Sequence, residues 1–256
     1  MTDTVKSVLI TAGASGIGWV IAEAFLSEGH QVHVCDISAE AIATIKAEHP
    51  LITATLGDVS LRGKVDQLFV EFQSLYGQLD ILVNNVGIAG PTGPMEDLTI
   101  EDWRQTIDIN LNSHFYFTKF AIPLLKKNKG GSIINLSSTA GLFGFPLRTP
   151  YAASKWAIIG ITKSLAMELG EFDIRVNAIC PGSVSGDRIN RVIEAKAKSI
   201  GSSEKEVKED FEAMVSLKTF VDKEDIANMA SFLISNEASK ISGQIMTVDG
   251  NTERMD

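Results

Sequence analysis

The feature that most constrains the fold of this chain is a short apolar run followed directly by a glycine-rich turn. Residues 7–11 are rich in aliphatic side chains, as a buried strand is, and Ala12-Gly-Ala-Ser-Gly16-Ile-Gly18 separates them from an apolar-periodic segment at 19–26. A strand, a glycine-rich turn and a helix, in this order, can place a dinucleotide pyrophosphate at the helix N-terminus. The order predicts a dinucleotide-binding turn in an α/β sheet, although loops also use glycine freely.

The rest of the chain continues the alternation of strands and helices without a linker or a low-complexity stretch. We expect strands at about 7–11, 31–36, 51–56, 79–84, 131–137, 173–179 and 245–248, and helices that include 16–28, 60–76, 99–126, 151–170 and 222–234. Short helical crossovers imply parallel strands with right-handed connections. The prediction is one Rossmann domain over residues 1–256: a doubly wound, seven-stranded parallel α/β sheet with helices on both faces, which binds ligands beyond the strands' carboxyl ends.

A tyrosine and a lysine lie four residues apart in Tyr151-Ala-Ala-Ser-Lys155, and Ser138 precedes the tyrosine by thirteen residues. Four residues are about one helical turn, so both side chains share a helix face. A cation at ~4 Å contributes about 4 kcal/mol at an effective dielectric constant of ~20, enough to make a phenol much more acidic. Tyr151 is therefore a candidate acid or base, with Ser138 beside the substrate oxygen, although so short a pattern also fits an ordinary helix.

The second expected strand ends in Asp36, eighteen residues after Gly18. A carboxylate there can accept hydrogen bonds from the adenosine ribose, although an aspartate at a strand end is also a common turn residue or helix cap. No arginine or lysine near Ser15 or Ile37 could balance a 2′-phosphate. These residues predict NAD rather than NADP.

Together these motifs resemble the short-chain dehydrogenase/reductase family, in its compact single-domain form. The resemblance runs from residue 7 to about 250 and adds these segments: Asp58-Val59, Asn84-Asn85-Val86-Gly87, Asn110 in Asp108-Ile-Asn-Leu111, the strand ending at Ser138, Asn177 to Gly182, and Ser242 to Gly250.

The resemblance implies which residues form the site. The catalytic residues it implies are Asn110, Ser138, Tyr151 and Lys155. The cofactor contacts it implies are Ala12, Ser15, Gly16, Ile17, Gly18, Asp36, Ile37, Asp58, Val59, Asn85, Val86, Gly87, Tyr151, Lys155, Pro181, Gly182 and Val184. Lys155 is expected to bind the nicotinamide ribose as well, and Asn110 to anchor a water that links Lys155 to solvent.

Two positions depart from the family pattern. Ala12 stands where the first glycine of the fingerprint is usual, and we expect a turn there that does not demand positive φ. Gly186 stands where a threonine often binds the nicotinamide carboxamide. Ser183, Ser185 or backbone groups are candidates to replace it.

Residues 186–220 are rich in Lys, Glu and Arg, and we expect a helical insertion there that fits either a solvated helix pair or, by the resemblance, a substrate lid. Arg148 lies three residues before Tyr151, and Arg188 lies in the insertion. We expect Arg148, with help from Arg188, to bind an anionic group of the substrate. The alternative is that Arg148 points to solvent or pairs with an acidic neighbour.

The expected function is NAD-dependent, reversible oxidation of a secondary alcohol, including a hydroxy acid or other anionic alcohol, to a ketone, with Tyr151 as acid and base. An NADH-dependent 3-oxoacyl-type carbonyl reductase is the main alternative. A silent cofactor sensor would not need Tyr151 and Lys155, and an isomerase or dehydratase usually has a larger substrate domain.

The composition of the chain limits the classes of molecule that it can be expected to bind. The formal charge of −9 disfavours nucleic acid, and no apolar run reaches the ~18 residues of a membrane span. Residues 1–6 do not read as a signal peptide, and two cysteines, Cys35 and Cys180, fit a reduced cytoplasm. Four scattered histidines predict no metal site. We expect a small-molecule substrate and, by the resemblance, a homotetramer.

Overall fold

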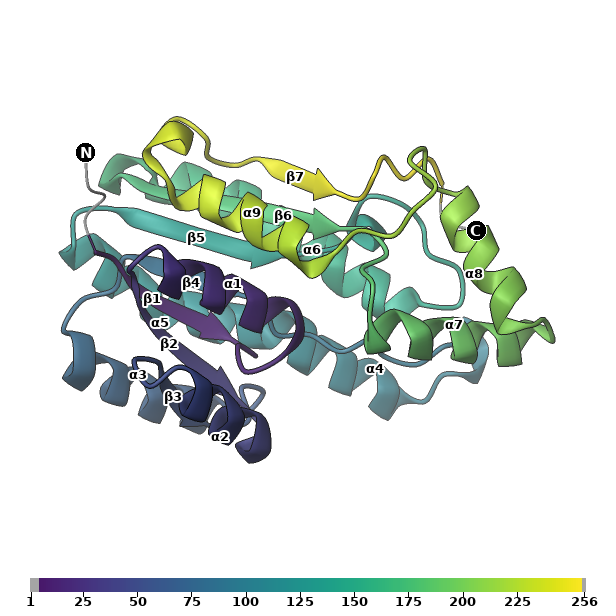
Figure 1. Ribbon diagram of the computed structural model, residues 1–256, viewed down its shortest axis with the longest axis horizontal. Helices are drawn as coiled ribbons and strands as arrows, with labels where there is room; N and C mark the ends of the chain where they lie inside the picture. The colour runs from purple at the N-terminus through teal and green to yellow at the C-terminus, as the bar shows by residue number, and fades with distance from the viewer. Residues whose placement is uncertain (1–4, 255–256) are drawn as a thin grey trace.

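The computed structural model describes residues 5–254. The predicted domain spans residues 1–256, so its residues 1–4 and 255–256 lie outside the described range. The expectation that residues 1–6 are not a signal peptide also falls mostly on residues outside this range. Within the described residues, seven parallel strands form one sheet in the order β3-β2-β1-β4-β5-β6-β7 (Figure 1). The strands are β1 (Ser7–Thr11), β2 (Gln31–Asp36), β3 (Thr53–Leu56), β4 (Ile81–Asn84), β5 (Gly131–Leu136), β6 (Ile174–Pro181) and β7 (Ile245–Val248). The predicted fold class is confirmed.

Helices cover both faces of this sheet. The α-helices are α1 (Gly16–Ser27), α2 (Ala39–Glu48), α3 (Arg62–Tyr76), α4 (Ile100–Ile107), α5 (Ser113–Lys127), α6 (Thr149–Leu169), α7 (Asp187–Ile200), α8 (Glu204–Ala213) and α9 (Lys223–Ile234). One apolar cluster joins α1, α2 and α9 to one face, and another joins α3, α5 and α6 to the opposite face. Among the described residues, no helix combines the length and the apolar character needed to cross a bilayer.

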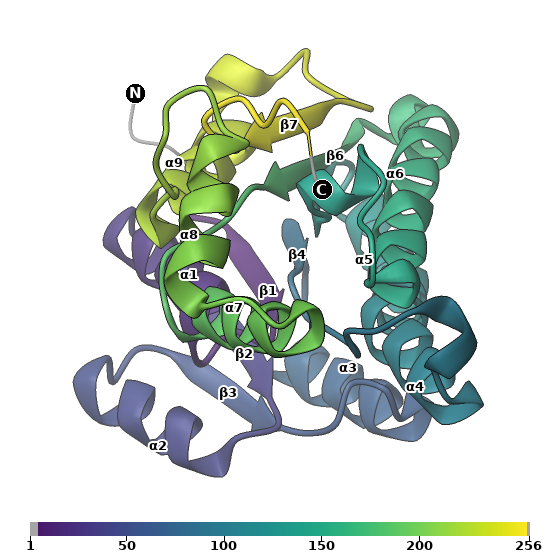
Figure 2. The same cartoon turned by 90° about the vertical axis from the view of Figure 1, so that its right-hand side faces the viewer.

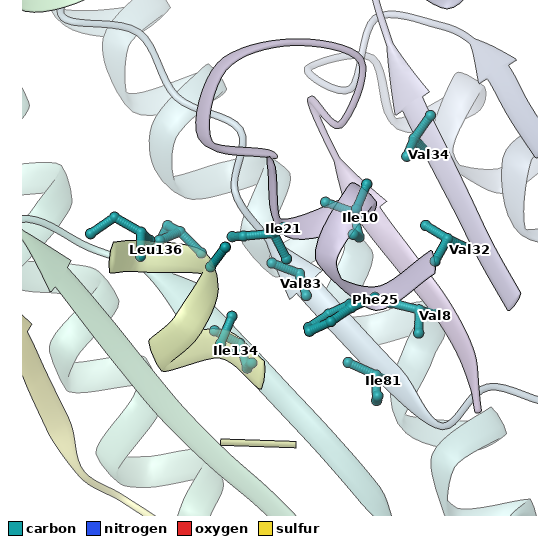
Figure 3. Packing of buried hydrophobic residues seen from close by; sticks show 14 of the residues in the cluster. Val8, Ile10, Ile21, Phe25, Val32, Val34, Ile81, Val83, Ile134 and Leu136 are labelled. Atoms are coloured by element: carbon teal, nitrogen blue, oxygen red, sulfur yellow. The ribbon is translucent and has the colours of Figure 1, made fainter. Parts of the chain in front are cut away.

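The alternation of side chains along β1 shows why the sheet needs helices on both sides. Val8 and Ile10 pack in the cluster of α1, whereas Leu9 packs in the cluster of α3 and α5. Phe25 of α1 is fully buried, and Figure 3 shows it close to Val8 and Ile81. Truncating a buried phenylalanine typically costs about 3–5 kcal/mol of stability, so this contact fixes α1, and with it the turn that precedes α1, onto the sheet.

Several element bounds differ from the sequence prediction. The expected helix 99–126 is not continuous, because a π-helical turn at Asp108–Asn112 separates α4 from α5. The π turn contains Asn110, whose side chain bonds to the backbone of Ile88 instead of facing solvent. β3 and β4 each begin two residues later than expected, and β6 extends to Pro181.

The expected insertion forms α7 and α8 beyond the carboxyl ends of the strands, where Figure 2 shows them in front of this edge. Ser203 and Glu206 form a capping box at the start of α8, and Gly201 ends α7 in a left-handed conformation. The two helices share a small apolar cluster of their own, which includes Ile193 and Phe211. The insertion is therefore a packed unit at the edge where ligands bind.

Candidate active site

A cavity of about 690 Å³ lies at the carboxyl edge of the sheet, between the glycine-rich turn, α6 and α7. It brings together residues that are far apart in the sequence. The sequence-predicted site residues that line it are Ala12, Ser15, Gly16, Ile17, Asn85, Gly87, Ser138, Arg148, Tyr151, Lys155, Pro181, Gly182, Val184 and Arg188. The other predicted residues, Gly18, Asp36, Ile37, Asp58, Val59, Val86 and Asn110, lie outside its lining.

The glycine-rich turn is tied to the end of β4. The Asn85 side chain donates to the carbonyl oxygens of Thr11 and Ala12, both at 3.0 Å. The Thr11 hydroxyl accepts the N–H groups of Asn85 and Val86 at 2.9 and 3.0 Å. A Cβ on Gly18 would lie 2.2 Å from the Ala12 carbonyl oxygen. Gly18 is therefore required for packing the turn, while Gly16, with a φ of +59°, faces open space.

The expectation for Ala12 is wrong in one respect. Its φ is +49°, in the left-handed region that side chains other than glycine rarely adopt. The bond that its carbonyl accepts from Asn85 and the close approach of Gly18 hold the turn in this shape. The departure from glycine is thus tolerated with local strain.

The N-terminus of α1 fits a pyrophosphate. Ser15 occupies the N-cap position but its side chain makes no capping hydrogen bond, and the first turn of α1 has no acidic residue. Ser15, Gly16 and Ile17 all line the cavity. The amide groups and the positive dipole end of this helix are thus directed at a place where phosphate groups can bind.

Asp36 is held rigidly at the end of β2. One carboxylate oxygen accepts the Ala14 N–H at 3.1 Å, and the other accepts the Ser38 N–H at 3.0 Å. Ile37 beside it is 71% exposed, as a side chain free to cover an adenine would be. Asp58 accepts the N–H and the hydroxyl of Ser60, and Val59 is buried. None of these four residues lines the cavity.

Lys155 is buried on α6 and donates to the Leu136 carbonyl oxygen at 2.8 Å. Its carbonyl accepts the Ser137 hydroxyl at 2.8 Å, which fastens α6 to the end of β5. Burial lowers the pKa of the Lys155 ammonium, whereas a Tyr151 phenolate raises it. The remaining N–H groups of the ammonium are available to the cavity.

Tyr151 faces the cavity with three cations around its ring. Desolvation alone would raise its pKa, but the charges of Arg188 and Lys155, a hydrogen bond with Ser138 and the charge of Arg148 together lower the pKa of the phenol below its ordinary value. Lys155 Nζ lies 5.7 Å from the ring centroid. Ser138 also accepts the Ala140 N–H, which fixes its hydroxyl at this point. The arrangement suits a phenol that exchanges a proton with a substrate oxygen.

Asn110 is fully buried beneath the cavity. Its amide oxygen accepts the Ile88 N–H at 2.7 Å, and its amide nitrogen donates to the Ile88 carbonyl and to the Ser154 hydroxyl. The side chain thus joins the π turn to the strand-end loop and to α6. The expected water anchored by Asn110 stays a prediction.

Gly186 explains the second departure from the family pattern. Its φ is +130°, a conformation that strains any residue with a Cβ, so a threonine is disfavoured at this position. The neighbouring Ser183 and Ser185 pair through their backbones with Val221. Their hydroxyls stay candidates for the carboxamide contact.

Sequence reasoning missed one glycine, Gly141, which lets the turn after Ser138 approach α6 closely. A Cβ on Gly141 would lie 2.7 Å from the Ser137 hydroxyl and 2.8 Å from the Lys155 carbonyl oxygen. Gly87, which the sequence predicts as a cofactor contact, also lies close to α6, since a Cβ on it would lie 3.4 Å from Lys155 Nζ. No pattern marks Gly141, because its role depends on contact with α6, which is distant from the turn in the sequence. Arg191 and Lys223 also line the cavity, and apart from their charge nothing in the sequence indicates that they belong to the site.

Arg148 is buried at 3% exposure beside the cavity, and Arg188 is exposed at its mouth. Arg148 therefore does not point to solvent, and no described carboxylate lies within ion-pair distance of either arginine. Whether they bind substrate stays a prediction.

A Rossmann sheet whose carboxyl edge joins a glycine-rich turn to a tyrosine–lysine pair defines an oxidoreductase that uses a nicotinamide dinucleotide. The family model described as enoyl-(acyl carrier protein) reductase matches residues 11–251. An uncharacterized oxidoreductase of Thermotoga maritima is 36% identical over 251 residues, which are 96% of this chain and 97% of the relative.

Two solved structures are also similar. A structure of NAD⁺-bound xylitol dehydrogenase superposes with a TM-score of 0.91 at 27% identity and covers 96% of this chain and 98% of its own. An actinorhodin polyketide ketoreductase variant with NADPH gives a TM-score of 0.92 at 31% identity, covering 98% and 97%. The chain belongs to the short-chain dehydrogenase/reductase family, as its motifs predict.

Proposed function

We propose that this protein catalyses the reversible, NAD-dependent oxidation of a secondary alcohol to a ketone. The observation that carries the proposal is the Tyr151 phenol, whose pKa is lowered by the surrounding cations and by the hydrogen bond with Ser138 although desolvation opposes this. A base in this form takes the hydroxyl proton without a metal ligand or a histidine.

The chain's residues divide the remaining work. Ser138 holds the substrate oxygen beside the Tyr151 hydroxyl, and Lys155, anchored by the Leu136 carbonyl, stabilises the phenolate. In the reverse direction the protonated tyrosine returns its proton to the forming alkoxide. The nicotinamide, when bound, supplies the hydride acceptor or donor. Asn110 holds the loop at Ile88 and α6 in register, so that both walls of the cavity keep their places.

The proposed cofactor is NAD rather than NADP. Both oxygens of Asp36 are fixed by backbone N–H groups, so the carboxylate cannot turn away from an added 2′-phosphate. A pair of like charges at ~4 Å costs on the order of 4 kcal/mol at an effective dielectric constant of ~20, before screening. The two similar structures carry NAD⁺ and NADPH respectively, so the distinction depends on Asp36. Comparable kcat/KM with NAD and NADP would refute this choice.

The direct test of the proposed function is Tyr151→Phe, assayed by NADH absorbance against a panel of secondary alcohols and ketones. Positioned proton transfer contributes roughly 10²–10⁴-fold, so kcat should fall at least about a hundredfold. The dissociation constant of NADH should stay within a few-fold, because the variant loses only a hydroxyl group. A variant with more than about a hundredth of the wild-type kcat would contradict the role of Tyr151.

An NADH-dependent reduction of a 3-oxoacyl group is the second candidate. The similarity to a polyketide ketoreductase favours it. The same panel separates the two, because a 3-oxoacyl reductase should reduce 3-oxoacyl thioesters with a higher kcat/KM than small ketones. A protein that retains NADH but converts no member of the panel would instead be the cofactor sensor.

We also propose a homotetramer. Trp156 and Met167 on α6 are 51% and 86% exposed, and Phe115 at the start of α5 is 54% exposed. A hollow of about 970 Å³ beside β7 exposes Leu217 and Phe232. Two separate apolar surfaces support two different subunit contacts. Two free, buried cysteines, Cys35 and Cys180, support a location in the reducing cytoplasm.

A further inference from the structure

Three cationic side chains converge on the Tyr151 ring without a counter-charge. The guanidinium carbon atoms of Arg148 and Arg188 lie 5.5 and 5.9 Å from the ring centroid, and Lys155 Nζ lies 5.7 Å from it. Among residues 5–254, no carboxylate lies within 4.0 Å of any of the three. Like charges this close repel one another, and the buried Arg148 and Lys155 also lose solvation.

Arg148 is the most informative of the three. It is 3% exposed, and its Nη2 donates to the Ala89 carbonyl oxygen at 2.5 Å. Its Nε is buried and has no hydrogen-bond partner. Burial, and the nearby charge of Arg188, lower the pKa of its guanidinium. A buried cation with an unused donor is costly unless something else supplies negative charge.

The backbone before Arg148 is held in an unusual shape. Leu147 has a φ of +63°, in the left-handed region, and its carbonyl accepts the Gly93 N–H at 2.9 Å. A leucine in this region costs of order 1–3 kcal/mol, which persists only where the surrounding structure imposes it. The strained turn directs the next side chain inward, against Phe145 and Tyr151.

We propose that Arg148 and Arg188 bind an anionic group of the substrate itself, a carboxylate or a sulfonate. The inference rests on the proposed function and narrows it to hydroxy acids and their keto counterparts. A guanidinium offers parallel N–H donors that match the oxygens of such a group. The pyrophosphate of the cofactor has its own place at the N-terminus of α1, whereas these two arginines lie against the ring of the catalytic tyrosine.

The position of the two arginines also limits the length of the substrate. Both guanidinium groups lie within 6 Å of the tyrosine ring, so the anionic group must be only a few bonds from the carbinol carbon. The cavity of about 690 Å³ must also hold part of the cofactor. A short-chain hydroxy acid or hydroxysulfonate fits both limits.

The test compares paired alcohols that differ only in charge. Short 2- and 3-hydroxy acids, a hydroxysulfonate and the neutral amides and methyl esters of the acids are assayed with NAD in the wild type, Arg148→Met and Arg188→Met. The wild type should prefer the acid to its amide in kcat/KM. Each variant should lower that ratio at least about tenfold, as the loss of a charge-assisted hydrogen-bond pair does. The ratio cancels any effect on Tyr151 shared by both substrates.

Two further variants separate recognition from folding. Arg148→Lys keeps the positive charge but loses the two parallel N–H donors of the guanidinium, so it should retain part of the preference for the acid. Arg175→Met removes a half-buried arginine on β6 that donates to the Ile241 carbonyl oxygen at 3.4 Å and does not line the cavity, and it should leave the ratio unchanged. Arg188 is exposed, so its variant keeps the test available if Arg148→Met does not fold.

The outcomes for the two proposals are distinct. If no alcohol is oxidised and no ketone is reduced, the proposed function fails; the anion site is then measured by thermal shift with NADH plus butyrate or butyramide. Stabilisation by butyrate alone, lost in Arg188→Met, would still support the site. Equal preference for the acid and the amide, or a ratio that neither variant changes, would overturn it.

Discussion

Replacing Gly141 by alanine should move Ser138 away from Tyr151, the two residues to which we assign the proton chemistry, without changing either residue. Gly141 ends the short turn at Thr139–Gly141 that follows Ser138. A Cβ there would lie 2.8 Å from the Lys155 carbonyl oxygen, whereas ordinary contact begins at 3.4 Å. Because the obstacle is helix backbone, the turn must move away from α6 by about 0.6 Å, the difference between these distances.

A displacement of this size should be visible in catalysis. Misplacing reacting groups by ~1 Å can cost on the order of a hundredfold, so we expect kcat to fall about 10- to 100-fold. Overpacking should also lower the free energy of unfolding by about 1–3 kcal/mol. The NADH dissociation constant, measured by fluorescence titration, should change little because the glycine-rich turn lies elsewhere. An unchanged dissociation constant for NADH would also show that the assayed variant is folded.

Gly144→Ala is the matched control in the same loop. A Cβ on Gly144 would meet no atom within 4 Å, and its φ is not positive. This variant should keep the wild-type kcat and gain about 0.4–1 kcal/mol of stability from a less flexible unfolded chain. If Gly141→Ala turned over within about threefold of Gly144→Ala, the close approach of the turn to α6 would not be what positions Ser138.

Three other perturbations test separate parts of the structure. Arg188→Met removes a positive charge that lowers the pKa of Tyr151, so this pKa should rise and the oxidation of a neutral alcohol should require a higher pH. Arg191→Met, on the same helix, should leave the pH profile unchanged. Identical pH profiles for the two variants would contradict the role of Arg188 in lowering the pKa of Tyr151. Gly18→Ala should lower the free energy of unfolding in urea by about 1–3 kcal/mol because its Cβ would meet the Ala12 carbonyl, whereas Gly63→Ala, which meets nothing, should not. Light scattering at micromolar concentration should give four times the 27.6 kDa of one chain, and a mass of one chain would refute the tetramer.

The sequence predicts the sheet well because its signals are local and regular. The run at β1, the glycines after it and the periodicity of α1 act over a few residues, and they give the strand, the turn and the helix close to their observed bounds. The strand ends then place Ser138 and Tyr151 at one edge without knowledge of their contacts. Each of these predictions needs only the period of the pattern and the direction of parallel strands.

What the sequence does not predict depends on contacts between distant segments. The π turn contains Asn110, and the Asn110 side chain accepts a hydrogen bond from the backbone N–H of Ile88, twenty-two residues earlier in the chain. The positive φ of Ala12 follows from the bond with Asn85 and the close packing of Gly18, which no local pattern encodes. Propensity alone assigns a continuous helix and a relaxed turn to these segments, and tertiary contacts override both.

If the two proposals hold, the cations around Tyr151 link substrate recognition to the acidity of the proposed base. The chain carries a formal charge of −9, which repels anions at long range, but salt screens exposed charges beyond about 8–10 Å. Inside the cavity, the electrostatic potential is therefore set mainly by the nearby charges of Arg148, Arg188 and Lys155. Before substrate binds, their charge favours the ionised phenol, which is the form needed for oxidation. An anion bound between the two arginines would offset part of that charge and make the phenolate a stronger base at the moment it must accept the proton. The two arginines that we propose to bind the anionic group would thereby couple substrate binding to the basicity of Tyr151.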